Sequence, residues 1–131
     1  MHHQTEEIPA KVESPDANIQ QLTDFGAFEG REFDVVRGTM SAGVDVTGLL
    51  EGLENDLCQS PHWGYIVDGA IHVRYADGTE EVNKAGEAVY WPPGHTLFTE
   101  DESVEFVLFS PQDEHSHALD HVMQKMSEME A

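Results

Sequence analysis

The stretch GEAVYWPPGHT, residues 86–96, has the pattern of a short strand that runs into a tight turn. Five residues separate Gly86 from Pro92, and a Pro-Gly pair follows directly. Proline holds φ at about −65° and glycine tolerates a positive φ, so the chain is expected to reverse here. A second strand then begins at His95, which places a histidine just beyond the turn.

Short β-rich segments separated by Gly, Asp and Pro surround this stretch from residue 31 onward. The Asp-Gly pairs at 68–69 and 77–78 are expected to form hairpin turns. About eight strands at this spacing predict an all-β sandwich or barrel, because closure removes edges that invite aggregation. The expected strands are 32–40, 44–50, 65–67, 71–75, 79–82, 88–91, 95–99 and 104–110.

Residues 1–30 are expected to form an N-terminal arm outside the barrel. Its first half is polar and includes two prolines, which favours a flexible start. A short helix is predicted from Ser14, which can cap it with Pro15 at the first helical position, to about Phe25.

The segment 113–131 changes to the periodicity of an α-helix, and the barrel of this single domain is placed at 31–112. Its apolar residues recur at i, i+3, i+4 and i+7, so one face should pack against the barrel or a partner chain. His117 and His121 fall within about 40° of each other on the solvated face and are not expected to be ligands. The apolar residues are Leu119, Val122, Met123 and Met126.

The chain is strongly acidic, with 6 Lys and Arg against 26 Asp and Glu and a formal net charge of -20. Such a field repels phosphate backbones and anionic lipids, so no nucleic-acid or membrane partner is expected. The scarcity of lysine favours the acidic shell of a salt-adapted protein, as a hypothesis. Apolar runs are short, no secretory signal is visible, and a single cysteine cannot form an internal disulfide. A cytoplasmic protein is therefore expected.

The frame of residues 86–101 resembles the second sequence motif of the cupin family, Gly-x5-Pro-x-Gly-x2-His-x3-Asn. The family's histidine would fall at Leu97, while this chain has His95 two residues earlier, and Asp101 replaces the Asn. Residues 95 and 97 of an extended strand face the same side. The ligating histidine is therefore expected at residue 95 in place of residue 97, one pleat earlier on the same face of the strand.

A second segment resembles, in spacing, the first cupin motif, Gly-x5-His-x-His-x3-4-Glu-x6-Gly. Gly69 matches its final glycine, and His62 stands at the Glu position. Cys58 and Asp56 stand at the two His positions, while Leu50 replaces the opening Gly. Each replaced ligand is still a residue type that binds metals, and Asp56 either completes the set or ends a loop.

The resemblance covers about residues 31 to 110 and implies a cupin β-barrel, also described as a double-stranded β-helix or jelly roll, often in a homodimer. It implies a ligand site in one mouth of the barrel. Cupin functions range from metal-dependent oxygenases and isomerases to sugar binding and storage. The stretches PHWGY, RYADGTEEV and WPPGHT resemble small stand-alone bacterial cupins without assigned chemistry, so whether this chain is an enzyme stays open.

Cys58, His62 and His95 are the candidate metal ligands. Cys58 and His62 have the same strand parity, so an extended segment puts both on one face if Pro61 does not interrupt it. A thiolate beside imidazoles favours zinc, with a fourth coordination position open to water. The competing interpretation is structural: a small buried thiol, an inward histidine bonded to the backbone, and a solvated histidine at a strand start.

Six aromatic side chains are expected either to line the barrel mouth around a small apolar or cyclic ligand or to fill the core. Two functions are open. The first is binding of a metal ion and a small molecule, with or without catalysis. The second is a non-catalytic sensor or scaffold without metal, which engages a partner protein through its acidic surface or Met-rich helix. The six aromatic residues are Trp63, Tyr65, Tyr90, Trp91, Phe98 and Phe106.

Overall fold

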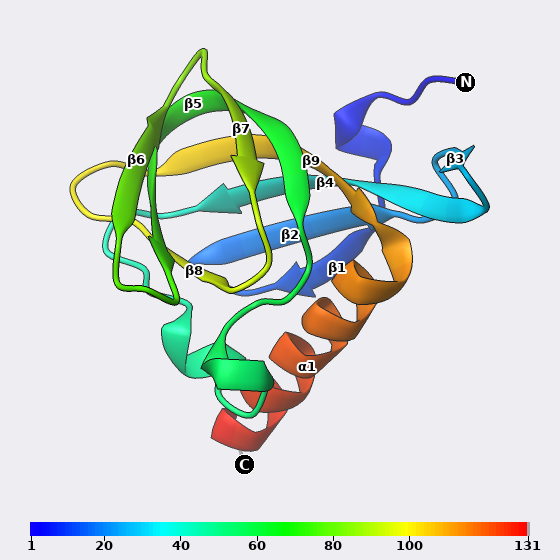
Figure 1. Cartoon of the computed structure of the whole chain (residues 1–131). Helices are drawn as coiled ribbons and strands as arrows, with labels where there is room; N and C mark the ends of the chain where they lie inside the picture. The colour runs from blue at the N-terminus through cyan, green and yellow to red at the C-terminus, as the bar shows by residue number, and fades with distance from the viewer. Residues whose placement is uncertain (131) are drawn as a thin grey trace.

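The fold is an antiparallel β-barrel with one long helix packed below it (Figure 1). The computed structural model describes residues 1–130. The strand order is β1-β2-β4-β9-β5-β6, with β3 on β4 and with β7 and β8 on β5. The strands are β1 (Ala10–Glu13), β2 (Ala17–Leu22), β3 (Ala27–Phe28), β4 (Arg31–Met40), β5 (His62–Tyr75), β6 (Glu80–Lys84), β7 (Ala88–Trp91), β8 (His95–Phe98) and β9 (Val104–Pro111).

The expected all-β architecture with a C-terminal helix is confirmed. The helix α1 spans Gln112–Glu130, and three short 3-10 turns are η1 (Thr5–Glu7), η2 (Thr47–Leu50) and η3 (Glu54–Asp56). Five expected strands, those at 32–40, 79–82, 88–91, 95–99 and 104–110, appear with boundaries within two residues of their expected positions.

Strand β5 joins the two halves of the barrel and arches over its top in Figure 1. Its first half pairs with β7 and β9, and its second half pairs with β6 and β8. The hairpin expected at Asp68-Gly69 is wrong, because the chain continues through a bulge between Ile66 and Asp68. Gly69 has a φ of 76°, and a Cβ there would collide with the carbonyl oxygen of Ser103. This glycine lets β5 bend between the sheets.

Residues 1–30 contribute the three strands β1, β2 and β3 to the sheet, so the helix predicted from Ser14 is wrong. Ser14 and Ala17 close a turn between β1 and β2: Ser14 N donates to Ala17 O at 2.9 Å, and Ala17 N donates to Ser14 Oγ at 3.0 Å. Pro15 has a φ that suits the second position of a turn as well as the first position of a helix. Strand β2 then pairs with β4 along its whole length, and that pairing favours the turn over the helix.

The strand expected at 44–50 is also wrong. Only an isolated bridge between Asp45 and Phe98 forms there, and the chain then enters η2. This turn buries Leu50 against Cys58 and Ala118 of α1. Tertiary packing under the helix therefore overrides the β-rich composition of the segment.

The barrel interior holds the main core, which includes Trp91, whose Nε1 donates to Asn83 Oδ1 at 2.7 Å. The other core residues are Val36, Met40, Ile66, Ile71, Val73, Val104, Phe106 and Leu108. Within the described part of the chain, no helix combines the length and the apolar character needed to cross a membrane.

Candidate metal centre

Backbone pairing brings Cys58 to the start of β8. Cys58 N donates to His95 O at 2.9 Å, and Cys58 O accepts from Gly94 N at 2.7 Å and from His95 N at 3.2 Å. The loop before β5 is thus fixed to Gly94 and His95, which lie 36 and 37 positions further along the chain. Residues that are distant in sequence therefore meet in the barrel.

Cys58, His62 and His95 place one ligand atom each within 4.8 Å of one another. Their exposed fractions are 8%, 3% and 1%, so the cluster is buried. Cys58 Sγ lies 3.7 Å from His62 Nε2. Ligand atoms around one tetrahedral zinc lie about 3.3–3.8 Å apart, so this pair already has that spacing and the third atom needs a shift of about 1 Å.

Both histidines are oriented by the nitrogen that faces away from the cluster. His95 Nδ1 lies 2.8 Å from the carbonyl oxygen of Pro92, which can only accept, so Nδ1 carries the proton and Nε2 keeps a lone pair. His62 Nδ1 lies 2.6 Å from Ser110 Oγ, which is completely buried. Such outer contacts typically orient the imidazole ligands of metals.

Three buried side-chain atoms of the described residues have no hydrogen-bond partner, and all three belong to this region: Asp34 Oδ1, His95 Nε2 and His115 Nδ1. Buried polar atoms are rarely left unpaired, and an ion or water is one explanation where they are. A metal ion would bind to His95 through this Nε2 atom. The donor set and this orphaned atom therefore fit a metal ion.

Burial keeps the cluster uncharged at neutral pH. It raises the pKa of the Cys58 thiol from 9.0 to about 11, although a backbone hydrogen bond with Ser60 opposes the rise. Burial also lowers the pKa of His95 from 6.5 to about 4. The hydrogen bond to the Pro92 carbonyl opposes this fall, and the nearby His115 adds to it. The pKa of His62 falls well below 6.5 through burial and the neighbouring His115 and His95. Neutral imidazoles are ready to bind a metal, whereas the thiol must first lose its proton.

His115, in the first turn of α1, is a member of the cluster that the sequence analysis missed. It is 4% exposed, and its ring centroid lies 4.5 Å from that of His62. Its Nδ1 lies 2.9 Å from Asp34 Oδ2, close but not aligned for a hydrogen bond. His115 precedes Leu119 by four residues, so helical periodicity already placed it on the apolar face.

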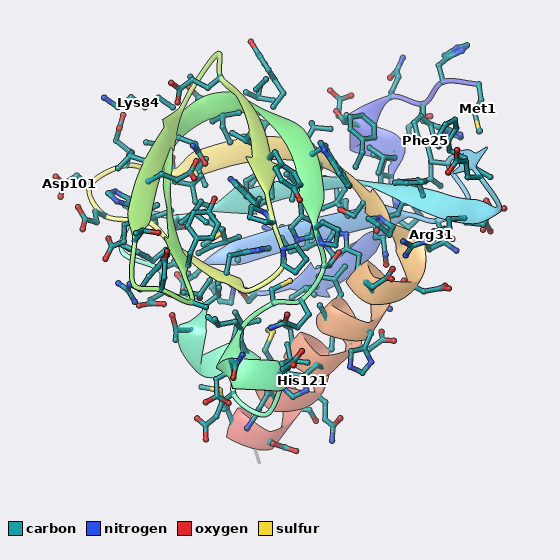
Figure 2. The ribbon with its side chains drawn as sticks, in the orientation of Figure 1. Met1, Phe25, Arg31, Lys84, Asp101 and His121 are labelled. Atoms are coloured by element: carbon teal, nitrogen blue, oxygen red, sulfur yellow. The ribbon has the colours of Figure 1, made fainter. Side chains whose placement is uncertain are left out.

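The other helix histidines have different environments. His117 is exposed, as expected. His121 is half-buried, and its Nε2 lies 2.8 Å from the carbonyl oxygen of Glu51, where α1 passes the loop between η2 and η3 (Figure 2). Asp56 is exposed, and its Oδ1 accepts from Gly52 N at 2.9 Å. Asp56 therefore closes a loop and lies outside the cluster.

A cavity of about 240 Å³ adjoins the cluster, between the inner face of the barrel, η2 and α1. Cys58, His62, His95 and His115 form one polar group in its wall, which Ser14, Asp16 and Thr96 also line. Aliphatic side chains from the sheet, η2 and α1 form most of the remaining wall.

The six aromatic residues divide into two groups. Phe106 lines the cavity, and Trp91 is buried beside it in the barrel core. Phe98 is buried outside that core, where its ring stacks on His72 and lies under the Arg74 guanidinium. The other three lie on the outer face of β5 and β7, which corrects their expected location in the barrel mouth. His62 points inward, so strand alternation turns residues 63 and 65 outward. These outer residues are Trp63, Tyr65 and Tyr90, which are 45%, 50% and 50% exposed.

No protein-family model and no curated protein sequence matches the chain. Solved structures match it in fold. The polyketide cyclase RemF from Streptomyces resistomycificus is 19% identical with a TM-score of 0.60, over 85% of this chain and 78% of RemF. An oxalate decarboxylase from B. subtilis is 16% identical with a TM-score of 0.58, over 83% of this chain and 28% of the decarboxylase.

A structure of the DMSP lyases RdDddP and RnDddQII is 13% identical with a TM-score of 0.54. The match covers 72% of this chain and 47% of that chain, so this protein spans about half of the lyase. These neighbours are cupins. The chain therefore has the cupin fold, as the resemblance of its motifs predicted.

Proposed function

We propose that the protein binds a zinc ion through Cys58, His62 and His95 and holds a small molecule in the adjoining cavity. One observation carries this proposal: three ligand atoms from separate segments converge in a buried site where His95 Nε2 has no other partner. Thiolate and imidazole ligands together favour zinc, and three protein ligands leave a fourth position for water or the small molecule.

The chain's own residues prepare the site. Ser110 and the Pro92 carbonyl hold the two rings, and Cys58 supplies the negative charge when its proton leaves. A bound zinc ion would supply Lewis acidity to an oxygen atom in the cavity. The proposed activity is binding, and no reaction is assigned. Enzymes named for small organic molecules occur among the similar structures, which supports a small-molecule ligand.

We also infer a reducing, cytoplasmic location, because the only cysteine of the chain is a free buried thiol and a member of the ligand set. A reducing compartment keeps a cysteine without a disulfide partner in the thiol form that a metal site needs.

A homodimer is proposed through an outer aromatic face, defined as Trp63, Tyr65, Tyr90 and Phe109. Trp63 is the cross-strand partner of both Tyr90 and Phe109, so the patch is continuous. The four side chains are 42% to 50% exposed, about 400 Å² per copy. A two-fold pairing buries about twice that area plus its rim, near the lower end for stable interfaces. Copies with a charge of -20 each can approach best through such an uncharged patch.

The metal site is tested by elemental analysis of protein purified without an affinity tag and dialysed against zinc. We expect one zinc per chain in the native protein and in the control His117→Ala, whose histidine is exposed. Cys58→Ala and His62→Ala should lose the ion, because each removes a ligand atom. A native chain without metal contradicts the proposal and favours the non-catalytic scaffold. Full zinc content in both ligand variants also contradicts it.

Proton release gives a second signature of the same site. At about pH 7.5 the imidazoles are already neutral and the Cys58 thiol is protonated, so each zinc should displace about one proton. Calorimetry in two buffers with different ionisation enthalpies measures this number. Cys58→Ala should release none, and zinc uptake by the native chain without proton release would remove the thiolate from the site.

A further inference from the structure

The cavity beside the cluster has two chemically different ends. Cys58, His62, His95 and His115 lie together at one end. The rest of the wall is mostly aliphatic and comes from four elements: Ile19 on β2, Val36 and Met40 on β4, Leu49 and Leu50 on η2, and Val122 on α1. Such a wall complements an aliphatic chain, because it offers dispersion contacts along its length and few hydrogen-bond partners.

Charge around the cavity selects against ionic ligands. No lysine or arginine is among the described residues that line it, while Asp16 lies in its wall at the exposed β1–β2 turn. The buried carboxylate of Asp34 lies 2.9 Å from His115 behind the polar end. The net charge of -20 adds a field that repels anions from the whole molecule. A buried ammonium group would need a paired carboxylate, and none is among the residues of the polar end.

The size of the cavity limits the ligand. An apolar protein cavity of about 150 Å³ is known to accept benzene, so 240 Å³ holds about ten non-hydrogen atoms. Met40 and Met126, from the sheet and from α1, line the same cavity. Methionine side chains adapt to irregular shapes, so the wall can follow a flexible chain.

His115 marks the boundary between the two ends. It lies on the same helical face as Leu119 and Val122, four and seven residues further on, and all three line the cavity. Its Nδ1 faces Asp34, which leaves Nε2 for a ligand. An oxygen atom at the polar end can therefore meet His115 and the metal ligands at once, while the chain attached to it follows the helix.

From these features we infer that the ligand is an uncharged aliphatic molecule of medium length with one terminal oxygen group, such as a primary alcohol or an aldehyde. The oxygen lies at the end formed by the histidines and Cys58, and the chain lies between the sheet and α1. The placement of the oxygen rests on the proposed metal centre, whereas the placement of the chain depends only on the aliphatic wall.

The test uses 1-octanol as the probe and octanoate as its charged counterpart, titrated calorimetrically into zinc-loaded native protein. We expect 1-octanol to bind at least about tenfold more tightly than octanoate. Val122→Phe, which fills the cavity, should weaken 1-octanol binding at least about tenfold, because the packed wall leaves no room. Val82→Phe makes the same change on the outside of β6, where the side chain is 43% exposed, and should bind 1-octanol like the native chain.

Zinc content and circular dichroism of Val122→Phe establish that this variant folds. Zinc uptake by the native chain without 1-octanol binding overturns the inference and leaves the metal centre intact. Equal 1-octanol binding by native protein and Val122→Phe, or tighter binding of octanoate, overturns it as well. Binding of 1-octanol by a chain that takes up no zinc supports the aliphatic site and overturns the metal centre.

Discussion

The ring of His95 is held in one orientation by the hydrogen bond between its Nδ1 and the backbone of the turn that precedes it. His62 is held in the same way by Ser110 on β9. The two rings are therefore positioned by different strands, and their centroids lie 5.1 Å apart. A site prepared in this way loses little conformational entropy when an ion binds.

The lowered pKa of His95 predicts how acid affects the metal-free protein. The pKa of His95 is about 4 in the folded state and 6.5 in its ordinary, solvated state, so folding favours the neutral ring. The resulting stability is complete above about pH 6.5 and is lost as the pH falls towards 4. This histidine alone should contribute about 3 kcal/mol of that loss in the free energy of unfolding.

Urea denaturation at several pH values between these limits measures the effect. His95→Gln should reduce the pH dependence by about 3 kcal/mol and leave the part that the buried His62 contributes, whereas His117→Gln, at an exposed position, should preserve all of it. A His95→Gln variant with the native pH dependence would show that this ring does not titrate in the way its burial implies.

Motif spacing brought Cys58, His62 and His95 together from sequence. The single extended segment assumed for Cys58 and His62 does not form, because β5 begins at His62 and Cys58 instead forms a bridge with His95. Cys58 and His62 are four residues apart, and His95 faces the same side as Leu97, which also lines the cavity. His115 was missed because it stands among other histidines in a polar helix start. The rotation of α1, which decides which histidine points inward, depends on how its apolar stripe packs on the sheet.

At the scale of elements, the chain has one Asp-Gly pair within β5 and another in the turn after it. The same dipeptide has a different outcome at each place. Asp77-Gly78 forms the expected tight turn, with Tyr75 N donating to Thr79 O at 2.9 Å. Asp68-Gly69 forms a bulge inside one strand of 14 residues. Both glycines have a positive φ, so the dipeptide predicts the local conformation. Whether the chain reverses depends on β9, which pairs alongside Gly69 and keeps the strand continuous.

This difference gives a matched pair of variants. Gly78→Ala places a Cβ in open space, so only the positive φ opposes it, at a cost of about 1–2 kcal/mol. Gly69→Ala adds a collision with the Ser103 carbonyl, so its free energy of unfolding should fall by more than about 3 kcal/mol. Chemical denaturation of both variants measures the difference. Equal losses would mean that β5 and β9 separate easily at the bulge.

At the scale of the whole molecule, the outer aromatic face predicts the oligomeric state. Trp63→Lys places a charge at the centre of the patch and should convert the dimer to a monomer. We expect the dissociation constant of the dimer to rise at least about tenfold. Val82→Lys adds the same charge on β6, outside the patch, and should remain dimeric. Sedimentation equilibrium measures the oligomeric state of the native protein and both variants. A monomeric native chain, or an unchanged Trp63→Lys dimer, removes the proposed interface.

The helix α1 has a further consequence for how the protein is made. The three proposed ion ligands have all been translated before α1 begins at Gln112, while His115 and part of the cavity wall are added afterwards. The proposed ligand set is therefore complete in the barrel segments, and a chain truncated after Pro111 would keep all three ligand residues but lose the helical wall of the cavity.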